Sequence, residues 1–249
     1  MTKKNNKVEL VLLPCAGKGT RMAPITEIFA KEMLPINCKP LLFYQIDYLT
    51  QCGIKEFIFV ISKEKENLRK YIEKYYKGKI KMNFVYQKTM NGTAKCVELS
   101  KGIIKNRNFL YINPDMISDS KEIYKNLIDS FDGCTVIHGF KIHDADVSKY
   151  GIFEFDKKTN MITKVLEKPL LTQTKSRIAG FLGVVCTKEV FDWIPSLTPK
   201  KGEYYFTEVF DSLSKLKRMK IYCSNVKIFD CGCKLGYAEC NDYYTKKNI

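Results

Sequence analysis

The sequence is poor in several residue types on which common functional classes depend. It contains one tryptophan and two histidines, His138 and His143, and nothing in the sequence pairs either histidine with a nucleophile. No apolar stretch approaches the ~20 residues of a membrane span. The apolar run at residues 10–13 is shorter than a secretory hydrophobic region and stops at Pro14. We therefore expect a cytoplasmic protein with no membrane partner.

Disulfide and zinc patterns are also missing, although the chain has 10 cysteines. None forms a Cys-x-x-Cys pair, and most lie in apolar runs. A secreted disulfide framework is denser and belongs to shorter chains. Cys231 and Cys233 are separated by one residue with no histidine nearby, which does not fit a zinc site. The pattern predicts free thiols in a reducing compartment.

Arginine is scarce in a strongly basic chain. Lysine and arginine total 42 against 27 acidic residues, for a net charge of +15, and most of the basic residues are lysines. Nucleic-acid-binding proteins use arginine heavily because its planar fork matches phosphates and guanine edges, and no recognised motif of that kind is present. The charge favours a lysine-rich solvated surface, with attraction to an anionic molecule as the alternative. We expect no nucleic-acid partner.

Strands and helices alternate along the first half of the chain. Hydrophobic patterning predicts strands at residues 8–13, 57–61, 80–86, 109–112 and 135–140. It predicts helices at residues 40–52, 63–76, 93–105 and 122–131. This alternation is typical of βαβ units with a parallel sheet.

The alternation loosens after Asp144. A hairpin is expected from residues 151–155 and 161–166, followed by a longer strand at residues 178–186. Short helices are expected near residues 188–194 and 207–217, and the tail from Leu235 is expected to be helical. We predict one α/β domain over residues 1–249, with a Rossmann-like, mostly parallel sheet flanked by helices and an antiparallel insertion in its second half.

A glycine-bearing loop, Leu-Pro-Cys-Ala-Gly-Lys-Gly-Thr-Arg-Met at residues 13–22, follows the first predicted strand. In open α/β sheets this is where ligands bind, and glycines there let the backbone approach a phosphate closely. The loop is neither a dinucleotide fingerprint, because Met22 occupies the third glycine position, nor a Walker A loop. Taken alone, Gly17-Lys18-Gly19 fits a surface turn equally well.

The residues that follow extend this pattern. Pro24 and Thr26 precede the run Lys31-Glu32-Met33-Leu34-Pro35-Ile36. The series G-x-G-T-R…P-x-T…K-E-M-L-P-I resembles the signature of sugar-1-phosphate nucleotidylyltransferases, and within that family the bacterial-type UTP–glucose-1-phosphate uridylyltransferases, or UDP-glucose pyrophosphorylases. The resemblance spans about residues 8–240. It implies a nucleotide-binding half at about residues 8–140 and a sugar-binding half with the antiparallel insertion at about residues 141–249.

The resemblance also implies roles for particular residues. Arg21 and Lys31 would be the catalytic residues: Arg21 would bind the leaving pyrophosphate, and Lys31 would place a positive charge beside the phosphates. Asp115 and Asp230 would hold Mg²⁺, a cation that prefers oxygen ligands. The residues implied for nucleotide binding are Ala16, Gly17, Gly19, Thr20, Gln87 and Gly92, and those implied for the sugar phosphate are Gly151, Glu167, Lys168, Gly180 and Glu203. The implied partners are UTP and a sugar 1-phosphate, and a homo-oligomer is plausible.

The implied reaction is in-line attack by a sugar-phosphate oxygen on the α-phosphorus of the nucleoside triphosphate, which expels pyrophosphate. It joins two anions, so positioning and charge neutralisation are the main tasks. No side-chain nucleophile or general base is required. We predict a Mg²⁺-assisted uridylyl transfer from UTP to a hexose 1-phosphate, with glucose 1-phosphate as the first choice.

Several alternatives stay open at this stage. Asn113-Pro114-Asp115 resembles the glucose enzymes, whereas Gly92-Thr93-Ala94 and Gly202-Glu203-Tyr204-Tyr205 resemble N-acetylglucosamine-1-phosphate uridylyltransferases. Glucose-1-phosphate thymidylyltransferases share the glycine loop and the chemistry. Ala30 and Cys38 depart from the proline and aspartate that many relatives have at these positions. A different class of function is a catalytically silent regulatory relative, because fold alone does not guarantee activity.

Overall fold

The computed structural model describes residues 7–200 and 202–247, apart from the side chain of Phe181. The predicted domain, residues 1–249, includes residues 1–6, 201 and 248–249, which lie outside this part. The α-helices are α1 (Leu41–Gln51), α2 (Glu66–Tyr76), α3 (Thr93–Leu99), α4 (Lys101–Ile104), α5 (Glu122–Asp129), α6 (Val190–Trp193), α7 (Thr207–Lys215) and α8 (Lys234–Lys247). The short 3-10 helices are η1 (Thr20–Met22), η2 (Ile25–Glu27), η3 (Lys31–Met33), η4 (Lys63–Lys65), η5 (Asp144–Lys149), η6 (Leu171–Gln173) and η7 (Ile194–Ser196).

The strands lie at or near most of the predicted positions. They are β1 (Leu10–Pro14), β2 (Pro35–Ile36), β3 (Lys39–Pro40), β4 (Glu56–Ile61), β5 (Lys81–Tyr86), β6 (Phe109–Ile112), β7 (Met116–Ser118), β8 (Thr135–Lys141), β9 (Gly151–Phe155), β10 (Ile162–Glu167), β11 (Ile178–Cys186), β12 (Met219–Cys223) and β13 (Ile228–Asp230). The hairpin of β9 and β10, the long strand β11 and the terminal helix α8 confirm three predictions for the second half. The short strands β2, β3, β7, β12 and β13 were not predicted.

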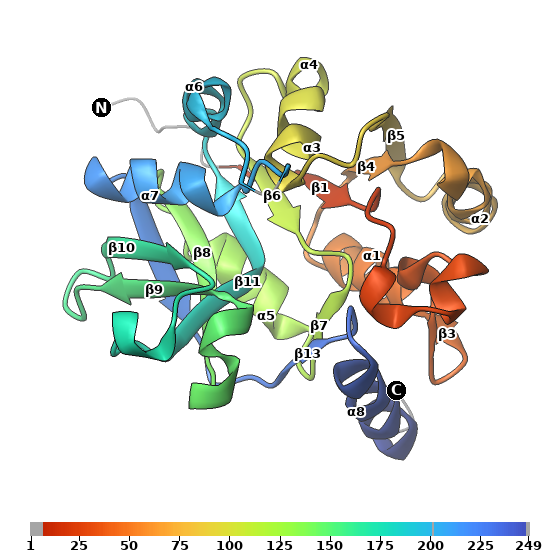
Figure 1. The fold of residues 1–249 in the computed structure, drawn as a ribbon. Coiled ribbons are helices and arrows are strands. Elements are labelled where there is room, and N and C mark those ends of the chain that lie inside the picture. The colour runs from red at the N-terminus through yellow and green to blue at the C-terminus, as the bar shows by residue number, and fades with distance from the viewer. Residues whose placement is uncertain (1–6, 201, 248–249) are drawn as a thin grey trace.

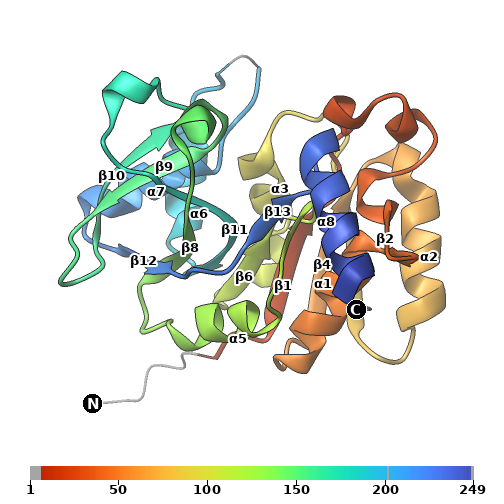
Figure 2. The same cartoon turned by 90° about the horizontal axis from the view of Figure 1, so that it is seen from below.

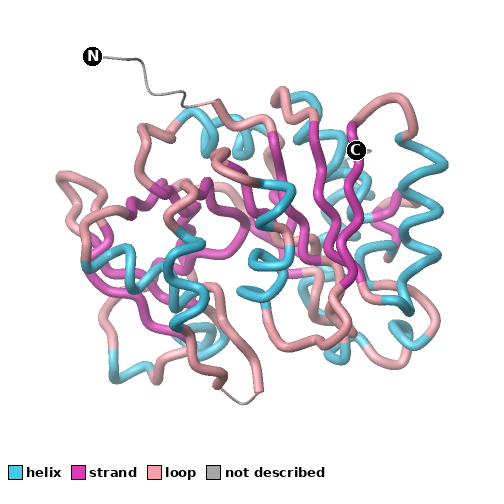
Figure 3. Tube along the Cα trace, turned by 90° about the horizontal axis from the view of Figure 1, so that it is seen from above, coloured by secondary structure: helices cyan, strands magenta, loops and turns pink. Residues whose placement is uncertain are grey.

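One sheet runs through both halves of the chain, and its strands extend through the molecule in Figure 3. Its order is β10-β9-β11-β6-β1-β4-β5, with β8 on the other edge of β11 and β12 beside β8. Strands β5, β4, β1 and β6 are parallel, whereas β11 is antiparallel to β6, β8 and β9. The predicted α/β fold, with a mostly parallel sheet and an antiparallel part, is confirmed.

Helices cover both faces of this sheet (Figure 1). Val11 and Leu13 of β1 point to the face packed by α1, α2 and α5. Leu10 and Leu12 point to the opposite face, which is packed by α3, α4, α6 and α7. Because successive side chains of a strand alternate between faces, a strand covered on both faces must be apolar throughout. This explains the continuous hydrophobic run that marks β1 in the sequence.

Two features of the helices were not anticipated. The predicted helix at residues 93–105 is wrong as a single element: it is divided into α3 and α4 at Ser100. The buried hydroxyl of Ser100 donates a hydrogen bond to the carbonyl oxygen of Cys96 at 2.9 Å, a bond that bends helices. Helix α8 packs beside β2 and β13, away from the main sheet (Figure 2). Across the described residues, none of the helices is both long enough and apolar enough to cross a membrane.

Candidate active site

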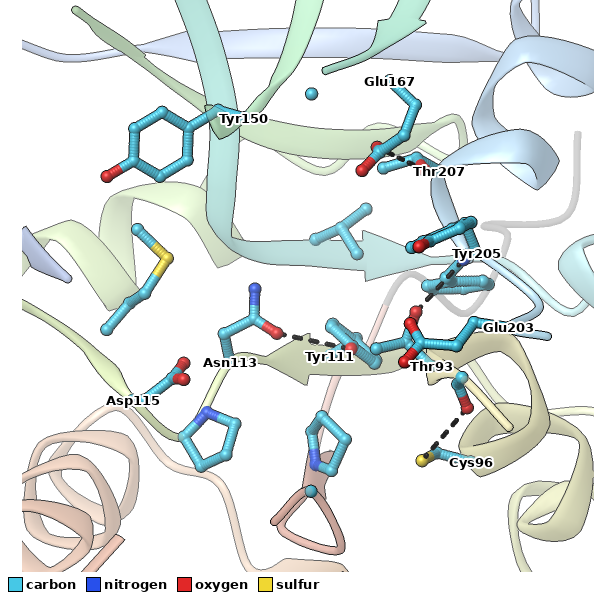
Figure 4. Close-up of a pocket in the computed structure, with 18 of the residues that line it drawn as sticks. Thr93, Cys96, Tyr111, Asn113, Asp115, Tyr150, Glu167, Glu203, Tyr205 and Thr207 are labelled. Atoms are coloured by element: carbon cyan, nitrogen blue, oxygen red, sulfur yellow. Dashed lines mark hydrogen bonds between the residues drawn. The ribbon is translucent and has the colours of Figure 1, made fainter. Parts of the chain in front are cut away.

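A cavity of about 550 Å³ lies at the carboxyl ends of β1 and β6, between the two halves of the chain. Figure 4 shows Asp115 and Tyr150 at the left of the cavity and Thr93 and Cys96 at the lower right. Glu167 lies at the top, beside Thr207. The structure brings most of the predicted site residues to its lining: Gly17, Arg21, Lys31, Gln87, Gly92, Asp115, Gly151, Glu167, Lys168, Glu203 and Asp230. Four predicted residues are not part of the lining: Ala16, Gly19, Thr20 and Gly180.

The glycine loop folds back on itself after β1. Gly19 has a φ of +71° and a Cβ there would lie 3.1 Å from Thr26 and 3.4 Å from Lys31. The hydroxyl of Thr26 donates a hydrogen bond to the carbonyl oxygen of Gly19 at 2.9 Å. A left-handed φ favours glycine, so Gly19 shapes the turn that carries Arg21 and Lys31 to the same place.

Two carboxylates and two cations converge beside Gly232. Lys31 Nζ lies 2.5 Å from Asp115 Oδ2, and Arg21 Nη1 lies 3.3 Å from Asp230 Oδ2. A Cβ added to Gly232 would lie 2.5 Å from Asp115 Oδ2, 2.8 Å from Arg21 Nη2 and 3.0 Å from Asp230 Oδ1. The missing side chain at this glycine therefore leaves a small space faced by all three polar groups.

The electrostatics of the two carboxylates differ. Burial raises the pKa of Asp230, and the charge of Asp115 raises it further, against the opposing effect of Arg21. Burial by itself would also raise the pKa of Asp115, but the charge and hydrogen bond of Lys31 hold that pKa below its usual range. Two neighbouring carboxylates favour a cation between them. Hard oxygen donors of this kind are suited to Mg²⁺, which is commonly bound by one or two carboxylates together with phosphates and water.

The pairing of β7 with β13 brings these two carboxylates together. Asp230 lies opposite Met116 in this antiparallel pair, so Asp115 and Asp230 lie at the same end of it. The backbone N–H of Cys231 also donates to the carbonyl oxygen of Asp115 at 2.8 Å. In the part of the chain that the structure describes, no set of three His, Cys, Asp or Glu side chains forms a complete protein metal cage. Any metal here would need ligands from a substrate or from water.

Gln87 and Cys96 form a second polar group at another end of the cavity. The Gln87 side-chain amide donates to Asn91 Oδ1 at 3.1 Å and to the carbonyl oxygen of Gly92 at 3.3 Å. The Cys96 thiol donates to Gln87 Oε1 at 3.1 Å, and burial raises the pKa of this thiol to about 12. These bonds fix the orientation of the Gln87 amide against the cavity.

Gly92 is required by packing as well as by its place in the lining. Its φ is +108°, and a Cβ there would lie 2.4 Å from the backbone oxygen of Tyr204. The backbone of Tyr204 exchanges hydrogen bonds with this segment, since its N–H donates to Asn91 and its carbonyl oxygen accepts from Ala94, at 2.8 and 3.0 Å. The loop before α3 is thereby fixed against the segment that carries Glu203.

The sugar-side residues lie on β10 and on the segments around it. Gly151 pairs with Glu167 across β9 and β10, and the hydroxyl of Thr207 donates to Glu167 Oε2 at 2.8 Å. The side chain of Lys168 is 52% exposed, with its Nζ 5.4 Å from the ring centre of Tyr205. Its Nζ also lies 3.8 Å from Glu167 Oε1, so an anion at the mouth of the cavity would compete with Glu167 for this exposed cation.

Gly180 is explained by packing within β11. A Cβ at this position would lie 2.7 Å from the ring of Phe153 and 3.0 Å from Ile137. Close packing therefore explains why this position is a glycine, without any contact between Gly180 and a ligand.

Sequence reasoning gave no individual role to several residues that line the cavity. Lys149 immediately precedes the Tyr150-Gly151 pair and forms an ion pair with Asp146 at 2.7 Å. Thr207 is the first residue of α7 and bonds to Glu167. Position next to a recognised motif was the only signal for either residue, because lysine and threonine are common surface residues.

An open α/β sheet with a cavity at its strand ends, a glycine loop and paired carboxylates and cations defines an enzyme that handles phosphates. The chain belongs to the nucleotidyl transferase family, which it matches over residues 10–244. The family resemblance seen in the sequence is thus confirmed. The chain is a sugar-1-phosphate nucleotidyltransferase by class.

The relatives and the similar structures carry more specific names. The chain is 27% identical over 263 residues to a UTP–glucose-1-phosphate uridylyltransferase of Streptococcus pyogenes, covering 93% of this chain and 86% of that protein. It is 25% identical over 270 residues to that of Staphylococcus epidermidis, covering 97% and 94%. A UDP-glucose pyrophosphorylase complexed with UDP-glucose matches with a TM-score of 0.89 and 27% identity, covering 97% of this chain and 100% of the other.

Proposed function

We propose that the protein transfers a uridylyl group from UTP to a hexose 1-phosphate, preferentially glucose 1-phosphate, and releases pyrophosphate. The observation that carries the proposal is the convergence of Arg21, Lys31, Asp115 and Asp230 beside Gly232. The similarity in fold and length to a UDP-glucose pyrophosphorylase complexed with UDP-glucose supports the choice of sugar and nucleotide.

The cavity offers three kinds of contact for these substrates. At the Gln87 end, both N–H donors of the amide are used within the protein, so a nucleobase would meet the second lone pair of Gln87 Oε1 and the backbone of Gly17 and Gly92. The Arg21 and Lys31 region presents cations to the triphosphate. Glu167 and Glu203 can accept hydrogen bonds from sugar hydroxyls, and the exposed Lys168 can bind the sugar's own phosphate.

In the proposed reaction, an oxygen of the sugar phosphate forms a bond to the α-phosphorus of UTP as the bond from that phosphorus to pyrophosphate breaks. Arg21 would bind the departing pyrophosphate, and Lys31 would neutralise charge on the phosphates. The phosphate oxygen is already an anion at neutral pH, so no general base is needed. The protein contributes mainly by positioning the two anions and by stabilising negative charge.

Asp115 and Asp230 fit a Mg²⁺ ion, since their oxygens and the phosphates would provide hard ligands around the space beside Gly232. When bound, the ion would neutralise phosphate charge. Each of these carboxylates also forms an ion pair with a proposed catalytic cation, Asp230 with Arg21 and Asp115 with Lys31. Asp115→Asn and Asp230→Asn each remove a carboxylate that would hold the ion, so we expect both variants to lose turnover. Full turnover in both variants would contradict the metal assignment.

The proposal is tested by pyrophosphate release with Mg²⁺, in which UTP and dTTP are each combined with glucose 1-phosphate and N-acetylglucosamine 1-phosphate. The highest kcat/KM is expected for UTP with glucose 1-phosphate. A preference for N-acetylglucosamine 1-phosphate or for dTTP would contradict that substrate choice within the same reaction class. Silence of the folded protein in every combination would favour a regulatory relative, and Asp230→Asn is the inactive control.

A further inference from the structure

A buried ion pair lies behind the phosphate end of the cavity. Glu32 is fully buried, and the side chain of Lys65 is 10% exposed. Lys65 Nζ donates to the two carboxylate oxygens of Glu32 at 2.9 and 2.8 Å, and to the carbonyl oxygen of Cys15 at 2.7 Å. The three N–H donors of an ammonium group are therefore all used within the protein.

These contacts join both ends of residues 15–32, the segment that runs from the glycine loop to η3, to a third segment. Cys15 is the first residue after β1, and Glu32 directly follows Lys31 in η3. Lys65 is the last residue of η4, just beyond the carboxyl end of β4. The loop between Cys15 and Glu32 carries Arg21, so one ammonium group fixes both ends of the segment that presents the two proposed catalytic cations.

Stability alone is a weak explanation for this pair. Removing two charges from water is unfavourable, and replacing a buried ion pair by hydrophobic side chains of similar volume is often neutral or stabilising. Neither Glu32 nor Lys65 lines the cavity, so neither is placed to touch a substrate. In some proteins, buried polar or ionic groups specify one arrangement of chain segments over others.

We propose that Glu32 and Lys65 are positioning residues that hold the two ends of residues 15–32 in register. The held loop keeps Arg21 near Asp230 and Lys31 near Asp115. This inference rests on the proposed function, because it assigns the pair a role in that reaction. A displacement of catalytic groups by about 1 Å can reduce a rate on the order of 100-fold, so a loosened loop would lower turnover without removing any catalytic residue.

The test is the double variant Glu32→Met/Lys65→Met, which replaces both charged side chains by apolar ones of similar volume. We expect a melting temperature close to that of the wild type and a kcat for pyrophosphate release lower by roughly 10–100-fold. The KM for the sugar 1-phosphate should not change, because Glu167 and Lys168 lie on the other half of the chain. If the pair only stabilised the fold, kcat would not fall while the melting temperature and the KM stayed unchanged.

Arg107→Met is the matched control. Arg107 Nη1 forms an ion pair with Glu56 at 2.7 Å, at the opposite end of the same strand β4. Glu56 keeps Lys81 as a second partner at 3.3 Å, so the variant should fold. It should lose some stability and keep the wild-type kcat.

Each outcome decides between the hypotheses. An active wild type and a folded double variant with wild-type kcat would overturn the positioning role alone. A folded wild type without activity in any substrate combination would overturn the proposed function, and this inference with it. If the double variant does not fold, Glu32→Gln alone decides: a lower kcat supports the proposal, and a wild-type kcat contradicts it.

Discussion

At the scale of single residues, Gly232 is where the smallest change should have the largest effect on the site. A methyl group there would lie 2.5 Å from Asp115 Oδ2 and 2.8 Å from Arg21 Nη2. Gly232→Ala should therefore push the carboxylates and Arg21 apart, and we expect kcat to fall on the order of 100-fold. Turnover measured across a Mg²⁺ titration checks this, and a wild-type kcat would contradict it.

Gly102→Ala is the control for that substitution. A Cβ at Gly102, in α4, would meet no atom within 4 Å. Alanine is the better helix former, by up to about 1 kcal/mol. This variant should keep its turnover and gain a little stability.

His138 should make the stability of the protein depend on pH. Burial lowers the pKa of His138 to about 4 from the ordinary 6.5. Between these values the unfolded chain takes up a proton that the folded chain does not, so stability falls as the pH drops from 6.5 towards 4. A pKa lowered this far corresponds to a loss of about 3 kcal/mol of stability over that interval.

Denaturant melts at several pH values test this prediction. The variant His138→Phe should show a weaker loss of stability over the same pH interval, whereas His143→Gln, which changes an exposed side chain, should behave like the wild type. Equal pH dependence in the wild type and His138→Phe would show that His138 is not responsible.

At the scale of elements, the site depends on a short pair of strands that the sequence did not reveal. Strands β7 and β13 have three residues each and lie more than 100 positions apart in the chain. Their segments are too short for a period-2 pattern to stand out. Asp115 and Asp230 could be singled out by family resemblance, but only this pairing explains why their carboxylates meet.

The contact between the loop before α3 and the segment of Tyr204 is a second example. Gly92→Ala should break it, because φ of +108° is unfavourable for alanine and the methyl group would meet the Tyr204 backbone at 2.4 Å. We expect a loss of about 1–3 kcal/mol of stability from the backbone alone, together with a higher KM for UTP. Chemical denaturation and steady-state kinetics measure the two effects.

Gly78→Ala separates strain from the loss of this contact. Gly78 also has a positive φ, of +79°, but a Cβ there would meet no atom within 4 Å. This variant should lose stability and keep the KM for UTP. An unchanged KM in Gly92→Ala as well would mean that the loop position does not affect nucleotide binding.

At the scale of the whole molecule, the two halves should unfold together. Strand β11 pairs with β9 through Ala179 and with β6 through residues 183–186. The sugar-side hairpin is therefore part of the same sheet as the glycine-loop half. Shared backbone pairing of this kind favours a single cooperative transition.

The single tryptophan, Trp193, reports on this prediction from α6 in the second half. Its fluorescence and the far-UV circular dichroism of the whole chain should give the same midpoint. UTP at about 100 times its Kd should add about 2.7 kcal/mol of stability and shift both signals equally. Two separate midpoints, or a shift in only one signal, would contradict a single cooperative unit.

The sequence by itself determined the class of fold, the order of most elements and the family. The apolar run of β1, the helix predicted at residues 40–52 and the motif containing Lys31 are local features, and local features are what periodicity and motif spacing record. Gly19, Gly92 and Gly180 were visible as glycines, but the sequence could not distinguish contact with a ligand from close packing.

Only the tertiary structure decided how distant segments meet. It placed β11 between β6 and β8 and brought Asp115 close to Asp230 through the pairing of β7 with β13. It also brought Lys65 into contact with both Cys15 and Glu32. Each of these contacts joins residues far apart in the chain, where packing and buried charge rather than local propensity fix the partner.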